Sequence, residues 1–406
     1  MGNPDAYLTR NDDWNPQHVI EWLSHEGRKL KCIELLMTRL SEQLQMQKIP
    51  LIRMRISLPT LNPQVFRRSY TWWIDKEKIE TYSAPHSITH SSDYIGSPIQ
   101  AIQATEEPYH RQLAECDYDS LHPVLQTLVD NGATDYLVIP IRFTFEEKVS
   151  PWILTTDHLQ GFSAADIEKY IQVSHYLAPL LEVLALHLTT QSLLETYLGV
   201  RTGQKVLNGK IQRGDGELIE AVIWYSDMRD STAIAESLNH QQLLHILNCY
   251  FEAISDSVTQ QGGEVLRFIG DAMLVVFTGD QYPSLAEAAK AALKAAEHAH
   301  QQITLVNEKL QQQNLPTIRY GLGLDVGSVI YGNVGASNRL DFTVMGSAVN
   351  RAARIENLTK IANCSLLVSE QLASLLDDEF CWKGAYPVAG LPQPLSVYCA
   401  KCEFQE

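Results

Sequence analysis

The sequence is 406 residues long, which is enough for two or three domains. Hydrophobic residues make up 45% of it, an ordinary share for a globular protein that buries a core. The formal net charge of −16 at pH 7 argues against non-specific binding to nucleic acid or to an anionic membrane. It does not exclude a polyanionic nucleotide, because a metal ion can bridge the two negative partners.

The first residues and the cysteines indicate a cytoplasmic protein. Residues 1–17 have no apolar core of the kind that a signal peptide needs, and no apolar run reaches the length that spans a membrane. The seven cysteines show no spacing typical of a disulfide framework, which fits a reducing compartment. We therefore expect a soluble, cytoplasmic chain with neither a membrane nor a nucleic acid as partner.

Residues 1–166 predict a first domain in which helices flank a central antiparallel sheet. Apolar residues recur at helical spacing from Trp22 to Leu44. Strand-like apolar runs follow at 51–58, 69–74, 135–143 and 151–157. Ser163, with Asp166 three residues later, marks the start of another helix. This order of elements indicates an α+β sandwich.

A long helical pattern over 167–200 joins the two halves of the chain. Its apolar stripe begins at Val173 and continues to Leu198. Either this helix packs on the sheet of the first domain, or it forms a parallel coil with a second copy of the chain. Pro179 would bend such a coil. We expect the first part of the helix to pack on the sheet and the last part to pair.

The second half of the chain, 201–406, carries the residues that can do chemistry. Its first motif, AVIWYSDMRDST at 221–232, is an apolar strand that ends at Asp227 and leads to the hydroxyl residues Ser231 and Thr232. A carboxylate suits a hard cation such as magnesium. The free N–H groups at the start of the following helix suit phosphate oxygens.

The second motif, EVLRFIGDAMLVVF at 264–277, predicts two strands joined by a tight turn at Gly270 and Asp271. The turn places Asp271 at the tip of a hairpin rather than inside a strand. If the hairpin lies beside the strand that ends at Asp227, the two carboxylates repel each other, and a cation is the usual remedy. Each aspartate alone could be an ordinary turn residue, but the two together favour a metal site.

The third motif, FTVMGSAVNRAARIE, leads from a glycine-rich pair of strands into a helix. Asn350 and Arg354 are four residues apart, so both project from one face of that helix. An amide and a guanidinium on one face can hold a ribose oxygen and a phosphate. A solvated helix face is the alternative, and it would be the better interpretation if the pair stood alone.

In this order the three motifs resemble those of the class III nucleotidyl cyclases, over roughly 197–398. YSDMRDST is similar to the first metal motif of that family, FIGDAMLVVF to the second, and FTVMGSAVNRAAR to the helix that contacts the ribose and the transition state. The resemblance implies a ferredoxin-like β-α-β-β-α-β core and a head-to-tail homodimer with its active sites between the subunits. The first domain resembles the GAF-type sensor domains, most clearly over 134–186, which implies a regulatory half that could take a small-molecule ligand.

The cyclase resemblance also implies roles for individual residues. Asp227 and Asp271, with the backbone carbonyl of Met228, would bind two Mg²⁺ or Mn²⁺ ions per active site. Asn350 would orient the ribose, and Arg354 would meet the negative charge that develops at the α-phosphate. In the family, these last two residues come from the opposite subunit to the aspartates.

Arg267 and Thr343 stand where the family reads the base of the nucleotide. Adenylate-forming members usually have lysine at the position of Arg267 and aspartate or threonine at that of Thr343, whereas guanylate-forming members typically have glutamate and cysteine. Arginine keeps the positive charge, but its fork also suits O6 and N7 of guanine. An ion pair between Arg267 and an acidic residue at the subunit interface is the structural alternative.

The implied phosphate-binding residues are Arg229, Ser231 and Thr232. One departure from the family concerns Ala389, which stands where a lysine or arginine usually contacts the β- and γ-phosphates. Lys383 or Arg229 could substitute for it.

From these observations we expect an adenylate cyclase that converts ATP to cyclic AMP and pyrophosphate under the control of its first domain. We expect a homodimer that pairs through the catalytic domain and the helix 167–200. A cyclase that prefers GTP and a degenerate nucleotide-binding regulatory module are the alternatives.

Overall fold

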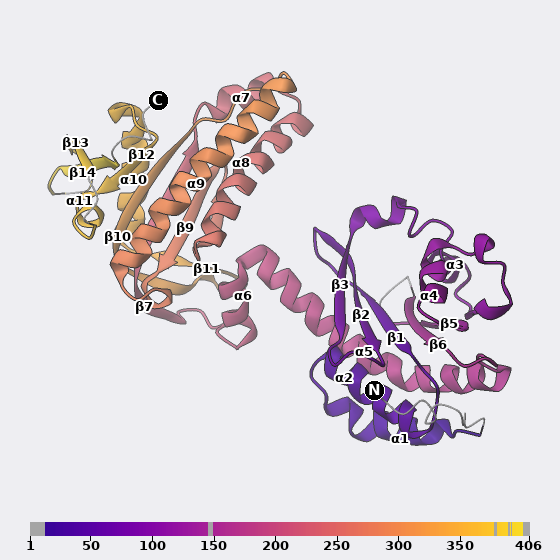
Figure 1. The fold of residues 1–406 in the computed structure, drawn as a ribbon. Coiled ribbons are helices and arrows are strands. Elements are labelled where there is room, and N and C mark those ends of the chain that lie inside the picture. The colour runs from indigo at the N-terminus through magenta and orange to yellow at the C-terminus, as the bar shows by residue number, and fades with distance from the viewer. Residues whose placement is uncertain (1–12, 145–148, 377–379, 389, 391, 401–406) are drawn as a thin grey trace. The chain divides into compact units, whose positions relative to one another are not determined.

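The structure is a computed structural model that describes residues 13–144, 149–376, 380–388, 390 and 392–400 (Figure 1). The chain divides into two compact units, Met1–Leu193 and Leu194–Glu406. One helix, α5, spans Ala164–Leu198 and therefore belongs to both. All three motifs lie in the second unit.

The first unit is built on an antiparallel sheet. Within the described residues this sheet has six strands in the order β3-β2-β1-β6-β5-β4, and every neighbouring pair is antiparallel. The strands are β1 Arg53–Pro59, β2 Val65–Trp73, β3 Glu80–Pro85, β4 Tyr109–Gln112, β5 Asp135–Ile141 and β6 Ser150–Thr156. The sheet was predicted from the sequence, but β3 and β4 were not, because most of their residues are polar and exposed.

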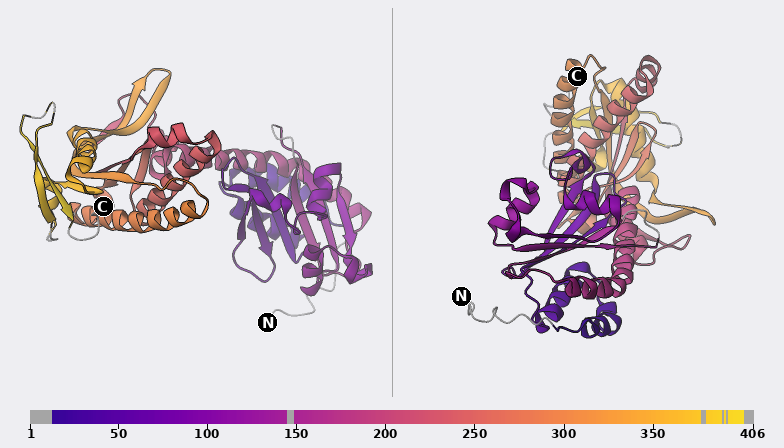
Figure 2. Two further views of the ribbon diagram at one scale, coloured as in Figure 1. Left: turned by 90° about the horizontal axis from the view of Figure 1, so that it is seen from above. Right: turned by 90° about the vertical axis from the view of Figure 1, so that its right-hand side faces the viewer.

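Helices cover both faces of this sheet (Figure 2). They are α1 Pro16–His25, α2 Ile33–Met46, α3 Pro98–Thr105 and α4 Pro123–Asp130, with 3-10 turns at Gly27–Lys29, His86–His90, Leu113–Glu115 and Tyr118–Ser120. α1, α2 and the first part of α5 pack on the face that carries Met54 and Ile56. α3 and α4 pack on the opposite face, against Tyr136 and Val138.

α5 begins at Ala164, directly after Ser163, which the sequence marked as the start of a helix, and it ends at Leu198, two residues before the predicted end of the joining helix. Ser163 and Asp166 cap its first turn, as predicted: the N–H and the hydroxyl of Ser163 both donate to Oδ2 of Asp166, at 2.9 and 2.7 Å. Val173 and Leu177 are buried in the core of the first unit. The first part of the helix thus packs on the sheet, as we expected.

α5 also corrects one expectation drawn from the sequence. It is 35 residues long, and by length and composition alone it is apolar enough to cross a membrane, whereas we expected no apolar run of that length. Single polar residues such as His175 and Glu182 interrupt the run, but its mean hydropathy still reaches 1.3. Of its most apolar window 22% is buried, and packing in the core of the first unit accounts for buried residues such as Leu181.

The second unit is built on a mixed sheet. Its described strands run in the order β13-β14-β12-β10-β7-β9-β8, with β11 paired to β10. They are β7 Gly216–Met228, β8 Glu264–Ile269, β9 Ala272–Thr278, β10 Tyr320–Ala336, β11 Arg339–Met345, β12 Leu366–Ser369, β13 Phe380–Tyr386 and β14 Leu395–Ala400. The helices are α6 Val200–Leu207, α7 Ser231–Ser237, α8 His240–Gln260, α9 Leu285–Gln312, α10 Ser347–Ala362 and α11 Glu370–Ala373, with a 3-10 turn at Gly279–Gln281.

The centre of this sheet has the predicted β-α-β-β-α-β order. β7, α8, β8, β9, α9 and β10 come in this order along the chain, with the short helix α7 between β7 and α8. Their strands lie in the antiparallel order β10-β7-β9-β8. α8 and α9 run side by side over the face formed by Val222, Trp224 and Leu322 (Figure 1). Buried alanines on α9, such as Ala292 and Ala295, let this helix lie close to the sheet.

α10 packs on the opposite face of the sheet, above β10. Two glycines of β10 make room for it. A Cβ on Gly323 would overlap the carbonyl oxygen of Ala352, and one on Gly321 would crowd the carboxylate of Glu356. The same face carries Asp227 of β7, because Asp227 pairs with Gly321 across the sheet. The fold thus brings α10 against the end of the strand that carries the first motif.

Candidate active site

Asp227 lies at the end of the central strand of the second unit. It is the penultimate residue of β7, opposite Ala272 of β9 and Gly321 of β10. The apolar residues before it are buried by the neighbouring strands and helices. The side chain of Asp227 is half-buried where that cover ends, so the strand presents a carboxylate at its tip.

Asp271 lies in the two-residue turn between β8 and β9. Gly270 has a φ of +67° there, a left-handed conformation that glycine adopts without steric cost. Because Ala272 follows directly and pairs with Asp227, the turn brings Asp271 close enough for its charge to raise the pKa of Asp227. The structure thus confirms the predicted turn and the predicted proximity of the two aspartates.

The pKa of Asp227 reflects how close the two groups are. Burial raises it first, and the charge of Asp271 and the hydrogen bond between the two side chains raise it further, to about 6. Lys360 and a backbone hydrogen bond with Met228 act in the opposite direction. Negative charge is therefore concentrated at this strand end, and the cations of the chain compensate only part of it.

Two carboxylates in this arrangement fit a magnesium or manganese ion. Mg²⁺ usually binds proteins through one or two carboxylates and keeps water or substrate phosphate as its other ligands. In the described part of the chain, no group of three or more His, Cys, Asp or Glu side chains could hold a metal by itself. Asp227 and Asp271 therefore suit an ion that is shared with a phosphate, and not a closed structural site.

Glu356 on α10 is a third acid at this place, and it was not predicted from the sequence. Its side chain is fully buried, and among the described residues neither carboxylate oxygen has a hydrogen-bond partner. Burial, followed by the charge of Asp227, raises the pKa of Glu356 to about 7, while Lys360 and Arg229 oppose the rise. The signal in the sequence is indirect, since Gly321 on the facing strand leaves the space that the carboxylate occupies.

Arg229, Ser231 and Thr232 follow Asp227 as the predicted phosphate ligands. α7 begins at Ser231, directly after the strand, as the motif predicts. Arg229 is buried, and its Nη2 donates to the carbonyl oxygen of Cys364 at 3.0 Å. The structure thus gives one donor of this guanidinium a partner inside the unit. The phosphate contacts of all three residues stay predictions.

Asn350 and Arg354 lie one turn apart on α10, as their spacing predicts. Asn350 is exposed and Arg354 is half-buried. Within the described residues, no hydrogen bond or ion pair links either side chain to Asp227 or Asp271. The described residues therefore show no direct contact between the pair Asn350 and Arg354 and the two aspartates.

A buried ion pair anchors the helix that carries Asn350 and Arg354. Nε of Arg351 lies 2.7 Å from Oδ2 of Asp325 on β10, and Asp325 is fully buried. Nη2 of Arg351 also donates to the carbonyl oxygen of Val326 at 3.3 Å. The pair holds the first turns of α10 on the sheet. No motif in the sequence marks it, because an ion pair between two elements leaves no local pattern.

Arg267 on β8 forms an ion pair with Asp341 on β11. A β-bulge between Val265 and Arg267 breaks the regular alternation of the strand just before the arginine. Thr343 is buried two residues beyond Asp341, and no hydrogen bond or ion pair joins it to Arg267 in the described structure. The structural alternative for Arg267, an ion pair, is therefore present, but it lies within one chain and not between subunits as the sequence analysis supposed.

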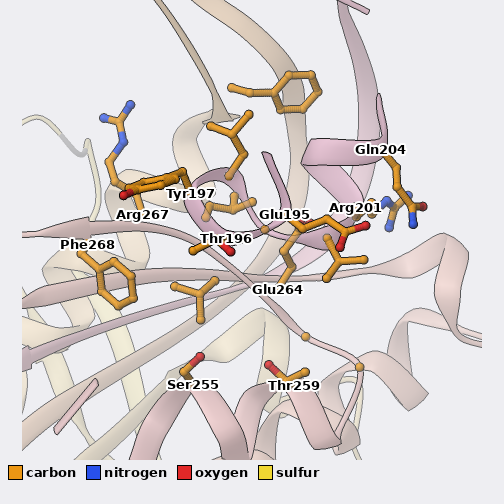
Figure 3. Close-up of a pocket in the computed structure, with 18 of the residues that line it drawn as sticks. Glu195, Thr196, Tyr197, Arg201, Gln204, Ser255, Thr259, Glu264, Arg267 and Phe268 are labelled. Atoms are coloured by element: carbon orange, nitrogen blue, oxygen red, sulfur yellow. The ribbon is translucent and has the colours of Figure 1, made fainter. Parts of the chain in front are cut away.

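Arg267 and Asp341 line a cavity of about 1010 Å³ within the second unit (Figure 3). Tyr197 and Phe268 contribute aromatic walls, and Glu264 contributes an acidic one. Neither aspartate of the predicted metal site lines this cavity. The cavity and the acidic cluster of Asp227, Asp271 and Glu356 thus mark different places in the same unit, and the chemistry assigned here depends on the cluster.

The departure from the family at Ala389 lies outside the described residues. Lys383, one of its two suggested substitutes, is half-buried on β13. Its role stays a prediction.

Comparisons with known proteins agree with the geometry of the second unit. Residues 217–400 match the family described as "Adenylate and Guanylate cyclase catalytic domain". The chain is 30% identical over 200 residues to an adenylate cyclase of Anabaena cylindrica, and 29% identical over 188 residues to adenylate cyclase 1 of Rhizobium meliloti (strain 1021). These alignments cover 47% and 44% of this chain but 38% and 27% of the two relatives, so the chain spans well under half of their length.

Among solved structures, a bacterial light-regulated adenylyl cyclase is 26% identical, with a TM-score of 0.48 over 55% of this chain and 65% of that one. The family match covers β7 to β14 and includes every motif described above. Residues 217–400 are therefore a catalytic domain of the adenylate and guanylate cyclase family.

Proposed function

We propose that the chain is a class III adenylate cyclase that converts ATP to 3′,5′-cyclic AMP and pyrophosphate. The observation that carries the proposal is the pair Asp227 and Asp271, which meets at one strand end within a cyclase catalytic domain. In the reaction the 3′-oxygen of the ribose attacks the α-phosphorus, the bond from that phosphorus to the oxygen bridging to the β-phosphate breaks, and pyrophosphate leaves. The names of the two relatives, both adenylate cyclases, favour ATP as the substrate.

The chemistry that two bound Mg²⁺ or Mn²⁺ ions supply is a lower pKa for the 3′-hydroxyl and neutralisation of the phosphates. Asp227 and Asp271 hold these ions, with the backbone carbonyl of Met228 as a further oxygen ligand. Asn350 orients the ribose through its amide, so that the 3′-oxygen faces the α-phosphorus. Arg354 donates to the α-phosphate oxygens as negative charge builds up there.

Ser231 and Thr232, at the start of α7, donate to the other phosphate oxygens. Arg229 joins them through donors other than the Nη2 hydrogen that binds the carbonyl oxygen of Cys364.

The active form in this proposal is a homodimer. No hydrogen bond or ion pair links Asn350 or Arg354 to the aspartates in the described part of one chain, and in this proposal a second copy supplies them across an interface. On α5, Val183 and Leu186 are 66% and 51% exposed, and large apolar side chains on a helix surface favour pairing. The two copies thus meet through the catalytic domain and through α5.

Arg267 and Thr343 read the base, with Asp341 beside the guanidinium. The carboxylate of Asp341 can accept a hydrogen bond from the 6-amino group of adenine or from N1–H of guanine. The fork of Arg267 fits O6 and N7 of guanine as well. This pair of side chains keeps a GTP-preferring cyclase as the second candidate.

The first unit acts in this proposal as a GAF-type regulatory domain of a cytoplasmic protein. Its antiparallel sheet with helices on both faces supports that assignment. Such a domain could take a small-molecule ligand and control the turnover of the second unit.

Product analysis of the purified chain with each of the four nucleoside triphosphates and Mn²⁺ tests the proposal. We expect cyclic AMP from ATP, and we expect Asp227→Asn to lose nearly all turnover while the protein stays folded. Asp230→Asn is the matched control, because Asp230 lies close to the site in sequence but forms an exposed ion pair with Arg319.

Three outcomes would change the assignment. Cyclic GMP as the main product would favour the second candidate. Nucleotide binding without any cyclic product would indicate a degenerate regulatory module. Equal turnover by Asp227→Asn and the wild type would contradict the metal site.

A further inference from the structure

Two arginines of β1 lie on the sheet face that α3 and α4 cover. Along β1, Met54 and Ile56 point toward α1, α2 and α5, so Arg53 and Arg55 point to the other face. The register places Thr155 of β6 directly beside Arg53. Arginines are seldom buried without a partner, because removing a charge from water costs free energy that only pairing offsets.

No carboxylate neutralises these arginines in the described structure. Arg53 is 7% exposed, and neither Arg53 nor Arg55 forms an ion pair or a hydrogen bond with a described residue. The Nε atoms of both arginines and Oγ1 of Thr155 are buried without a hydrogen-bond partner there. Glu80 attracts Arg53 at longer range, but its carboxylate is exposed and already paired with Lys76.

The aromatic neighbours of Arg53 compensate only part of its charge. The guanidinium carbon lies 5.3 Å from the centre of the Trp73 ring, which is a cation–π contact. Tyr136 keeps its proton, since burial raises its pKa to about 12. Burial, and then the charge of Arg55, lower the pKa of Arg53 to about 10, so Arg53 is still charged at neutral pH. Two positive charges therefore face this part of the sheet.

Arg67 on the neighbouring strand shows how the same face satisfies the Nη2 donor of an arginine. It is 6% exposed, and its Nη2 donates to the carbonyl oxygens of Ser57 and Val149 at 3.1 and 3.2 Å and to Oγ of Ser150 at 3.0 Å. The two arginines of β1 have no such contacts with the described residues. Their donors are thus available to a ligand.

We propose that Arg53 and Arg55 bind an oxyanion, the carboxylate or phosphate group of a small molecule, inside the first unit. Guanidinium groups match both anions with pairs of N–H donors. Thr155 adds a hydroxyl, and Trp73 adds an aromatic face for the rest of the ligand. A regulatory role for this site rests on the proposed sensor function of the first unit. Anion binding itself depends only on these four side chains.

Thermal unfolding of the full-length chain in sodium phosphate or sodium succinate, compared with sodium chloride of equal ionic strength, tests the site. Tryptophan fluorescence mainly follows the first unit, which holds five of the seven tryptophans. We expect one anion to raise the melting temperature of the wild type by about 5 °C near saturation. Arg53→Met should lose that rise. Arg39→Met should keep it, because Arg39 is exposed and paired with Glu42.

The two anions distinguish the sources of the ligand group. A rise in phosphate alone indicates a phosphorylated ligand, and a rise in succinate alone indicates a carboxylic acid. Equal rises in the wild type and Arg53→Met, or no rise in either anion, would overturn the proposal. If Arg53→Met does not fold, Arg55→Gln carries the same expectation. Because turnover is not measured, an anion response in a catalytically inactive chain would separate this proposal from the proposed cyclase activity.

Discussion

Two carboxyl groups near the end of β7, Asp227 and Glu356, contribute to the way in which the second unit responds to pH. The ordinary pKa values of Asp227 and Glu356 are 3.8 and 4.5, and the fold raises them to about 6 and about 7. A raised carboxyl pKa means that the folded state favours the protonated form. Each group therefore stabilises the fold below its ordinary pKa, and this contribution is lost as the pH rises through the raised value.

We predict that, in the presence of a chelator, the free energy of unfolding falls as the pH rises from about 4 to about 7. Asp227→Asn should flatten this fall, because an amide does not ionise. Above about pH 6, Mn²⁺ should make this fall in the free energy of unfolding smaller, since a cation then stabilises the ionised carboxylates of Asp227 and Asp271. Denaturant unfolding at each pH measures the effect, with Asp230→Asn as the control that keeps the wild-type profile. Identical profiles for the wild type and Asp227→Asn, with or without Mn²⁺, would contradict the prediction.

Arg267 carries a second prediction at this scale. Arg267→Lys should keep cyclase activity and raise the ratio of ATP to GTP turnover, because a single ammonium group suits N1 of adenine and lacks the fork that favours guanine. Arg267→Glu combined with Thr343→Cys should lower that ratio. Each base hydrogen bond is worth roughly 1–3 kcal/mol, so we expect changes of about tenfold.

The control for Arg267 is Arg339→Lys, which changes an exposed arginine on β11 and should leave the ratio as it is. The readout pairs initial rates for the two nucleotides with the dissociation constant of the dimer. An unchanged ratio with weakened dimers would assign Arg267 to assembly.

The residues that could be predicted from the sequence are those whose neighbours in space are also neighbours in the chain. Asp227 ends an apolar strand, and Asp271 follows a glycine in a tight turn, so both were readable. Glu356 was not readable, because the residues that define its surroundings lie on two strands far from it in the chain. They are Asp227 on β7 and Gly321 on β10. For Arg267 the residue type was readable, but its partner Asp341 depends on how β8 and β11 meet.

At the scale of elements, the position of α10 depends on the buried pair of Asp325 and Arg351. We predict that Arg351→Met lowers the free energy of unfolding by about 3 kcal/mol or more, because an uncompensated buried charge costs about 3–5 kcal/mol. Asp325→Asn combined with Arg351→Met should recover most of the loss. Arg319→Met, which breaks an exposed pair with Asp230, should cost less than about 1 kcal/mol. Denaturant unfolding of the four proteins measures these differences.

Kinetics separate a positioning role of this ion pair from a purely structural one. In the double variant, whose fold is largely restored, a displaced α10 should lower kcat more than it raises KM, because Asn350 and Arg354 act mainly in the transition state. Wild-type kcat in a double variant with restored stability would limit the pair to a structural role.

The elements differ in how well the sequence predicts them. Long apolar patterns predicted α5 and the strands β1, β2, β5, β6 and β7 to β9, because burial imposes the period of the structure on the sequence. β3 and β4 were not predicted, because they are short and polar. They lie at the two edges of the sheet and are held there by backbone hydrogen bonds to β2 and β5. The bulge in β8 could not be predicted from the sequence either, because an extra residue in one strand can be recognised only from its pairing with the neighbouring strand, here β9.

At the scale of the whole molecule, shared active sites predict complementation between inactive variants. Asp271→Ala and Asn350→Ala should each be nearly inactive alone. When equal amounts exchange subunits, about a quarter of the wild-type activity should return, because half of the dimers are mixed and each mixed dimer has one intact site. Cyclic AMP formation measures the recovery, and native mass spectrometry confirms the exchange.

The matched control for complementation mixes Asp271→Ala with Asp227→Ala. These two changes damage the same half of the site, so their mixed dimers contain no intact site and should stay inactive. If exchange occurs and Asp271→Ala with Asn350→Ala still shows no recovery, each chain holds a complete site of its own.

The acidic cluster of Asp227, Asp271 and Glu356 also bears on how long the molecule survives. Repulsion within the cluster favours local opening of this end of the sheet, and proteases cut a folded chain in proportion to the population of its open form. A divalent cation that binds the closed form lowers that population by mass action. A fall in free magnesium would then shorten the lifetime of the protein as well as slow its chemistry, so the three acids would couple the abundance of the chain to the ionic state of the cell.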